Sequence, residues 1–130
     1  MPAPLGKTPT RKMPNIQVFG TNDSQPTRAA LRFFRERRIV VHFVDLKKKP
    51  IAAGELRRFT ERLGASALLD RDSRPYRDQG LAHLTMDDRG ITARLLSDTH
   101  LIRLPLVRYG EQVTAGKDEA TWREWLATPR

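Results

Sequence analysis

Cysteine is absent from all 130 residues, and this absence alone excludes several kinds of chemistry. Without a thiol, the chain has no disulfide, no thiolate zinc site, no iron–sulfur cluster and no nucleophilic cysteine. Long apolar runs are missing as well, since no stretch approaches the roughly 18 apolar residues of a transmembrane helix. The sequence therefore predicts a cytoplasmic protein without membrane contact, whose function does not depend on a thiol of its own.

Acidic residues are few relative to basic ones, and the imbalance is concentrated in one part of the chain. Lys and Arg number 24 against 15 Asp and Glu, which gives a formal net charge of +9. Residues 28–49 contain eight of the basic side chains and two acidic ones, Glu36 and Asp45. This segment forms either a solvated face that aids solubility or a docking surface for an acidic protein. Nucleic acid is not the expected partner, because aromatic residues for base stacking are not interleaved there. The candidate partner-binding patch consists of Arg32, Arg35, Arg38, Lys47, Lys48 and Lys49.

The first 15 residues differ in composition from the rest. They hold four of the nine prolines and three basic residues but no acidic residue. Such a segment buries too little apolar surface to fold alone. We therefore expect residues 1–15 to form a disordered basic arm and residues 16–130 to form one domain.

The first half of this domain has a strand, helix, strand pattern. An apolar run over 16–19 predicts a buried strand, and Ser24 followed by Pro26 is typical of a helix start. Apolar residues at helical spacing extend the helix over 26–38, and a β-branched run predicts a second strand over 39–46. A right-handed crossover of this length places the two strands parallel in one sheet.

The second half predicts mostly helices and one hairpin. A helix is expected over 52–63, with short helices around 65–69, 75–81 and 88–96. Strands over 104–108 and 112–114 flank a turn at 109–111, and a final helix from Asp118 turns Trp122 and Trp125 toward the core. This order is typical of the thioredoxin-like α/β class, a βαβ…ββα mixed sheet with a helical insertion.

Three separated blocks carry the motifs of a known family. They read FGTNDSQPTRAALRFFRERRI, ALLDRDSRPYRDQGL and LIRLPLVRYGEQVTAGKDEATW. Their strand, loop and helix opening, their Leu-Leu and Tyr-x-x-x-Gly-Leu stretch, and their proline before a hairpin resemble the arsenate reductase (ArsC) and Spx family. The resemblance covers residues 16–126 and implies the same thioredoxin-like fold.

The resemblance also implies a candidate loop for binding an anion or a thiol, although three of its functional positions differ. Ser24 occupies the position of the family's loop cysteine, and Asp70 and Leu104 stand where arginines are usual. Arg28 and Pro105 match the family, which implies a cis Leu104–Pro105 bond facing the Ser24 loop. The candidate loop consists of Thr21, Asn22, Ser24, Arg28, Leu104 and Pro105.

Ser24 has three alternative interpretations. A helix N-terminus lowers the pKa of a thiol, but a hydroxyl stays protonated near neutral pH unless an adjacent base activates it. The histidines are His42, His83 and His100, and none lies in the first block beside Ser24. We therefore predict that Ser24 caps the helix. The alternatives are that its hydroxyl and nearby amides hold an anion or the sulfur of glutathione, or that this serine replaces a cysteine by engineering.

Other polar residues have structural interpretations. His83 and Asp87 are four positions apart, but no third ligand is placed to complete a metal site, so none is expected. Asp87 and Asp88 are interpreted as caps of the helix that follows. Tyr76, in the second block, is expected to pack the helical insertion in place.

Two functions follow. The leading hypothesis is a cysteine-less binding or regulatory module without catalysis, which contacts a protein partner as the resemblance to Spx, an RNA polymerase adaptor, implies. The alternative is a glutathione-dependent oxidoreductase of the arsenate reductase kind, or a transferase. Such an enzyme would use an external thiol at the Ser24 loop, with Arg28 as the anion contact. No cofactor is expected under the first hypothesis and glutathione under the second.

Overall fold

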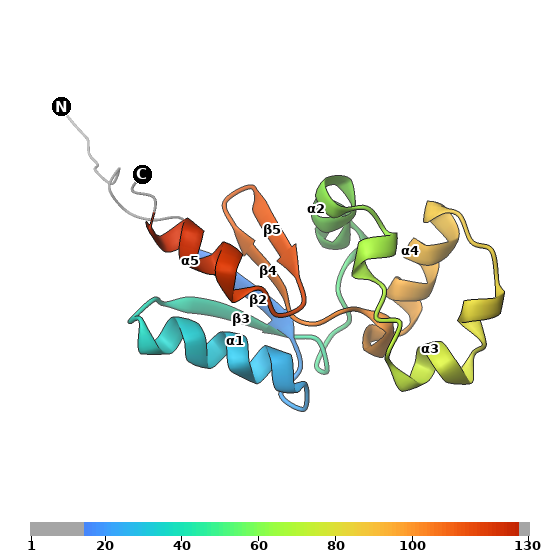
Figure 1. Ribbon diagram of the computed structural model, residues 1–130, viewed down its shortest axis with the longest axis horizontal. Coiled ribbons are helices and arrows are strands. Elements are labelled where there is room, and N and C mark those ends of the chain that lie inside the picture. Colours follow the sequence, from blue (N-terminus) through green and yellow to red (C-terminus); the bar gives the residue numbers. More distant parts are fainter. Residues whose placement is uncertain (1–14, 128–130) are drawn as a thin grey trace.

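A four-stranded mixed sheet in the order β3-β2-β4-β5 occupies one half of the structure, and the helical insertion forms the other half (Figure 1). The computed structural model describes residues 15–127, so the expected arm lies outside the described residues except for its last position. β2 pairs parallel with β3 and antiparallel with β4, and β4 pairs antiparallel with β5. The strands are β2 (Ile16–Gly20), β3 (Val41–Asp45), β4 (Leu106–Tyr109) and β5 (Gln112–Ala115).

α1 (Gln25–Glu36) connects the two parallel strands, as the sequence predicts. The helix ends before the predicted position 38, because Arg38 has a left-handed φ of 61° through which no α-helix continues. The amide of Arg38 instead donates to the carbonyl of Arg35 at 2.9 Å, which closes the last turn. The paired part of β3 consequently starts at Val41, two residues inside the predicted strand.

β4 and β5 form the predicted antiparallel hairpin with a shorter turn. Tyr109 pairs with Gln112, so Gly110 and Glu111 alone form the turn and Tyr109 belongs to the strand. Gly110 has a φ of 63°, and short hairpin turns favour glycine in this left-handed conformation. β4 begins at Leu106, later than predicted, because the proline before it has no N–H to give to a strand ladder.

α1 and α5 (Glu119–Ala127) share one hydrophobic cluster with the sheet. The ring of Trp122 lies 5.4 Å from Phe33 and 5.3 Å from Phe34, measured between ring centroids. Its indole N–H donates to Thr114 Oγ1 at 2.9 Å, so the buried polar atom is satisfied. Trp122 and Trp125 are buried, and their predicted role as core anchors is confirmed.

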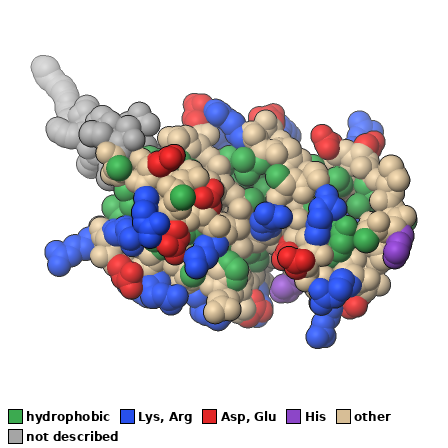
Figure 2. Space-filling view, viewed as in Figure 1, with side chains coloured by type: hydrophobic (Ala, Val, Ile, Leu, Met, Phe, Trp, Pro, Cys, Tyr) green, Lys and Arg blue, Asp and Glu red, His purple; other side chains and the backbone are tan. Residues whose placement is uncertain are grey.

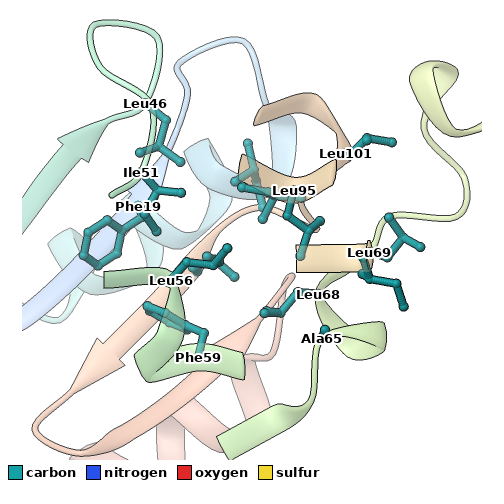
Figure 3. Close-up of a cluster of buried hydrophobic side chains, with 14 of the residues drawn as sticks. Phe19, Leu46, Ile51, Leu56, Phe59, Ala65, Leu68, Leu69, Leu95 and Leu101 are labelled. Carbon is teal, nitrogen blue, oxygen red and sulfur yellow. The ribbon is translucent and has the colours of Figure 1, made fainter. Parts of the chain in front are cut away.

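α2 (Ala53–Leu63) and the helical insertion build a second cluster (Figure 3). Leu56 and Phe59 of α2 are fully buried, and Phe59 meets Phe19 of β2 edge to face with centroids 5.7 Å apart. Leu68 and Leu95 extend the cluster into the insertion. The insertion contains η2 (Ser66–Leu68), α3 (Arg74–Asp78), η3 (Leu81–His83), α4 (Asp88–Ser97) and η4 (Thr99–Leu101).

The insertion is helical, as the sequence predicts, but its helices begin and end at other residues than predicted. The helix predicted over 75–81 divides at Gly80, whose φ of 66° interrupts it, and the helix predicted over 65–69 is a 3₁₀ turn. Asp87 caps α4 by accepting from the Gly90 amide at 2.8 Å, and Tyr76 is buried, as expected. Every helix within residues 15–127 is too short or too polar to span a bilayer.

Candidate functional site

Ser24 caps the N-terminus of α1. Its Oγ accepts a hydrogen bond from the Thr27 amide at 3.2 Å, and its own amide donates to the Thr21 carbonyl at 3.1 Å. Pro26 follows in the first turn, where its fixed φ suits the helix and its missing N–H leaves no bond unmade. Within residues 15–127, the Ser24 hydroxyl makes no hydrogen bond other than this capping bond. The predicted cap is therefore confirmed.

Gly20 holds the loop close to α1. A Cβ placed on Gly20 would clash with Thr27 Oγ1 and would lie 2.6 Å from Thr27 Cγ2. No side chain fits there, so glycine is required where the end of β2 meets the first turn of the helix. The Thr27 side chain is itself fully buried. The close approach fixes the position of the Ser24 loop relative to the sheet.

A cavity of about 480 Å³ lies between the Ser24 loop and the helical insertion. The peptide between Leu104 and Pro105 is cis, as the resemblance implied, and Leu104 forms part of the cavity wall. The lining comes from three parts of the chain that are distant in sequence: the loop after β2, the start of α3, and the segment from η4 to the cis proline. The lining residues are Thr21, Asp23, Ser24, Pro26, Asp70, Ser73, Arg74, Pro75, His100, Ile102 and Leu104.

The structure brings some of the predicted loop residues together and separates others. Arg28 does not line the cavity, because its guanidinium turns back and donates to the Asn22 carbonyl at 2.8 Å. Asn22 is exposed, and Pro105 is buried in the bend before β4. The predicted loop residues that line the cavity are Thr21, Ser24 and Leu104.

Asp23 brings a negative charge to the cavity wall. A hydrogen bond from the Thr21 hydroxyl, and then one from Lys47, hold the pKa of its carboxyl below the ordinary value. Lys47 Nζ lies 3.1 Å from Asp23 Oδ2. His100 Nε2 lies 4.0 Å from the same oxygen, and His100 Nδ1 lies 3.9 Å from Asp98 Oδ1. Because Lys47 balances the charge of the Asp23 carboxylate, this pair supplies no net positive charge for an oxyanion.

Arg74 and His100 line the cavity although the sequence analysis did not assign them to the Ser24 loop. Arg74 begins α3 and His100 lies in η4, so the insertion folds back to place both of them on the wall of the cavity that Ser24 also lines. The Ser-Arg-Pro sequence is typical of a helix start and could have placed Arg74 in the first turn of a helix. Ser73 caps α3 by accepting from the Tyr76 amide at 3.3 Å, which sets the first turn of α3 on the cavity wall. No local pattern marks His100.

The two positions where the family usually carries arginine have structural roles here. Asp70 Oδ1 accepts from the Asp72 amide at 3.0 Å and so shapes the turn before α3. Leu104 is 8% exposed and belongs to the hydrophobic cluster. Arg103, one position earlier, does not line the cavity. A Cβ placed on Gly116 would lie 2.8 Å from Arg103 Cδ, so the arginine stem lies against the end of the hairpin instead.

The cavity suits the binding of a ligand better than the activation of a hydroxyl. Its ionisable lining groups are Asp23, Asp70, Arg74 and His100, and Lys47 is paired with Asp23, so the Asp, Arg and Lys charges balance and leave no excess of cations. Within residues 15–127, no carboxylate or imidazole hydrogen-bonds to Ser24 Oγ. A serine hydroxyl without a bonded base is a weak nucleophile.

The predicted basic patch is exposed, but it divides into two groups. Because α1 is the crossover between two parallel strands, it runs antiparallel to β3. The end of α1 therefore lies beside the start of β3, and the Lys47–Asp23 ion pair joins the end of β3 to the loop before α1. Figure 2 shows Lys and Arg side chains interspersed with acidic ones over this part of the surface. The exposed residues are Arg32, Arg35 and Arg38 in one group and Lys47, Lys48 and Lys49 in the other.

Comparison with known sequences establishes the family. The sequence profile of the ArsC family matches residues 19–125. The chain belongs to the ArsC family. The match includes the Ser24 loop, the insertion, the cis proline and the hairpin, so the absence of cysteine is a departure within the ArsC core. No curated protein sequence matches the chain.

Solved structures show the same fold. The ArsC-family protein is similar to the YffB protein, with a TM-score of 0.80 and 19% identity over 87% of this chain and 100% of that one. An arsenate reductase from Vibrio cholerae gives a TM-score of 0.75 with 17% identity, over 87% of this chain and 98% of that one. An arsenate reductase related protein from Brucella melitensis gives 0.66 with 17% identity, over 88% and 96%. The fold is thioredoxin-like, as predicted.

Proposed function

We propose that this ArsC-family protein is a cytoplasmic, non-catalytic binding module that contacts an acidic surface of a protein partner. One observation carries the proposal: at the family's cysteine position, the Ser24 hydroxyl makes a capping bond with the Thr27 amide. A hydroxyl in this role completes a helix start and supplies no nucleophile. The fold remains while the reactive sulfur is absent.

The charge of the cavity supports the same conclusion. The ionised carboxyl of Asp23 and the carboxyl of Asp70 lie in the wall, and Leu104 replaces a cation with an apolar side chain. Because Lys47 and Arg74 only balance these two carboxylates, an oxyanion substrate would find no excess of cations to stabilise its charge. Arsenate reduction is therefore not the activity that this lining favours.

The exposed cations of α1 supply the binding surface. Arg32 and Arg35 are exposed, and neither makes a side-chain hydrogen bond or ion pair within residues 15–127. Guanidinium groups that are free of internal partners are available to carboxylates of another protein. Electrostatic contacts of this kind speed association and weaken as salt rises.

Affinity capture with a matched pair of variants tests the proposal. The full chain is immobilised in 50 mM NaCl with a lysate of its native host, and retained proteins are identified by mass spectrometry. Arg32→Glu with Arg35→Glu should lower retention of the acidic partner by about tenfold, because two attractive contacts become repulsive. Arg57→Glu with Arg89→Glu makes the same change in net charge at exposed positions on α2 and α4 and should leave retention unchanged. Equal retention by both variants, or no retained protein at all, contradicts the proposal.

A second candidate function is supported by the open cavity itself. A volume of about 480 Å³ beside Ser24, with Arg74 in its wall, offers room and one cation for a small anionic thiol such as glutathione. Isothermal titration with glutathione separates the candidates. Saturable heat that is lost in both Ser24→Ala and Arg74→Ala favours a glutathione-dependent protein, whereas no heat favours the binding module.

A further inference from the structure

β3 is an edge strand whose outer side has no partner among residues 15–127. It pairs with β2 alone in the described sheet. Leu46, at its end, donates its amide to the Gly20 carbonyl of β2 at 2.8 Å. Amide directions alternate along a strand, so the amides of Val41 and Phe43 point to the opposite, outer side. Asp45 points to the same side, but its carbonyl accepts from the Lys48 amide at 3.2 Å, so Val41 and Phe43 are the residues presented for a further ladder.

The sequence of this edge lacks the features that usually protect edge strands. The segment 39–44, IVVHFV, contains no proline and no Lys, Arg, Asp or Glu. Natural edges are normally blunted by charges, prolines, bulges or covering segments. Val40, directly before β3, is 87% exposed, although valine is usually buried. An apolar strand of this kind is favourable for pairing with another strand.

Charge limits what can pair there. Arg37 and Arg38 directly precede the apolar segment, and Lys48 and Lys49 follow it closely. Asp45, between them, accepts from the Lys47 amide at 3.0 Å and keeps its negative charge, but Lys48 and Lys49 outnumber it at this end. Both ends of the edge are therefore basic and exposed.

A second copy of this chain fits the edge poorly. Two β3 strands related by a twofold axis pair antiparallel, which brings the lysines after one strand against the arginines before the other. Like charges at both ends of a ladder are destabilising. A complementary strand has the reverse pattern, with an apolar or β-branched centre and acidic residues on both sides.

From this geometry we infer that the outer edge of β3 binds an extended segment of the partner protein as a fifth strand, with Asp or Glu at both ends of that segment. Main-chain hydrogen bonds to Val41 and Phe43 supply the pairing, and the flanking cations select the acidic ends. The inference rests on the proposed binding function and names where and in what conformation the partner binds. It needs no ligand in the cavity.

Hydrogen exchange with a defined probe tests the inference. The probe is a fluorescein-labelled synthetic peptide with a Thr-Val-Thr-Val-Thr centre between two Asp-Glu pairs, and the comparison peptide carries Lys-Lys pairs instead. The acidic peptide should bind saturably in 50 mM NaCl and slow exchange at the amides of Val41 and Phe43. The amides of His42 and Val44 face β2 and serve as internal controls. Equal binding of the basic peptide, or protection that spares Val41 and Phe43, overturns the inference.

Two variant pairs test the main chain and the charges separately. Val41→Pro removes one outward N–H, whereas Val41→Thr keeps it with a side chain of the same shape, so the first should abolish peptide binding and the second retain it. Lys48→Glu with Lys49→Glu should weaken binding by about tenfold, and Arg57→Glu with Arg89→Glu should not. Undiminished binding in a folded Val41→Pro variant contradicts the inference. If that variant does not fold, exchange protection in the unmodified protein decides.

The outcomes distinguish this inference from the proposed function. Thiol-dependent turnover by the purified chain contradicts the proposed function and leaves the peptide result unaffected. Absence of peptide protection, while Arg32→Glu with Arg35→Glu still lowers partner capture, contradicts the edge site and retains the binding module. A salt-stable dimer that Val41→Pro dissolves shows that a second copy occupies the edge, which also overturns the inference.

Discussion

The cavity beside Ser24 and the outer edge of β3 differ in whether their polar groups have bonding partners within the described residues. At the cavity, Ser24 accepts a hydrogen bond from the Thr27 amide, and Asp23 forms an ion pair with Lys47. At the edge, the outward amides of Val41 and Phe43 have no partner among residues 15–127. The comparison teaches that the loop at the family's cysteine position is held by bonds within the chain, whereas the outer edge of the same sheet has main-chain amides without a partner in the described residues.

Both regions depend on the cluster beneath α1, and removing its largest member should have the greatest effect. Trp122→Ala should lower the free energy of unfolding by about 3–5 kcal/mol, because a fully buried indole that contacts Phe33 and Phe34 is lost. Urea unfolding followed by circular dichroism measures the change. Trp122→Phe, which keeps an aromatic ring but loses the bond to Thr114, should cost less. A loss under about 1 kcal/mol for Trp122→Ala contradicts this account of the core.

Gly20→Ala should disturb the cavity side of the comparison and leave the β3 edge intact. The added methyl group meets the buried Thr27 side chain, and overpacking of this kind costs about 1–3 kcal/mol. Amide exchange should accelerate in the Ser24 loop before it does so in β3. Gly54→Ala is the matched control, because nothing lies within 4 Å of its Cβ position in α2. That variant should be neutral or stabilised by up to about 1 kcal/mol.

Ser24 itself offers a smaller and more specific perturbation. Ser24→Ala should lower the free energy of unfolding by about 1 kcal/mol through loss of the cap, and Ser24→Asp should recover most of that amount because aspartate also caps helices. Thermal melts of the three proteins measure the series. A Ser24→Ala variant as stable as the unmodified chain would show that the capping bond does not hold the loop.

Asp23 gives the smallest expected effect, and its sign follows from the lowered pKa. A carboxyl whose folded-state pKa lies below its unfolded value, about 4, stabilises the fold above that pH and loses this contribution as the pH falls through the folded-state value. Asp23→Asn should therefore be less stable than the unmodified chain at pH 7. The difference should shrink toward pH 3, as chemical unfolding at the two pH values will show. A difference that grows on acidification contradicts the assigned ion pair.

Residues that act through neighbours in sequence were predictable, and residues that act across the fold were not. Ser24 as a cap and the two tryptophans as core anchors follow from local spacing, and the structure confirms them. The cis bond before Pro105 came from family resemblance, because backbone isomers leave no local signature. Arg74 and His100 could not be placed beside Ser24, since a helical insertion with irregular turns positions them.

The basic patch also shows what the sequence alone could not predict. Charge counting predicted a basic segment over residues 28–49, but the crossover of α1 divides it between the two ends of β3. Composition reports how many cations a segment carries, whereas topology decides where they meet. The position of the apolar edge between the two groups becomes visible in the folded sheet.

Turnover by the purified, unmodified chain is the most direct measurement of the central claim that Ser24 supports a helix and does no chemistry. Arsenate consumption is followed with glutathione, glutaredoxin and a coupled NADPH assay, beside a cysteine-containing arsenate reductase as the positive control. The account predicts a rate equal to that without the protein. A rate clearly above this background that disappears in Ser24→Ala would contradict it.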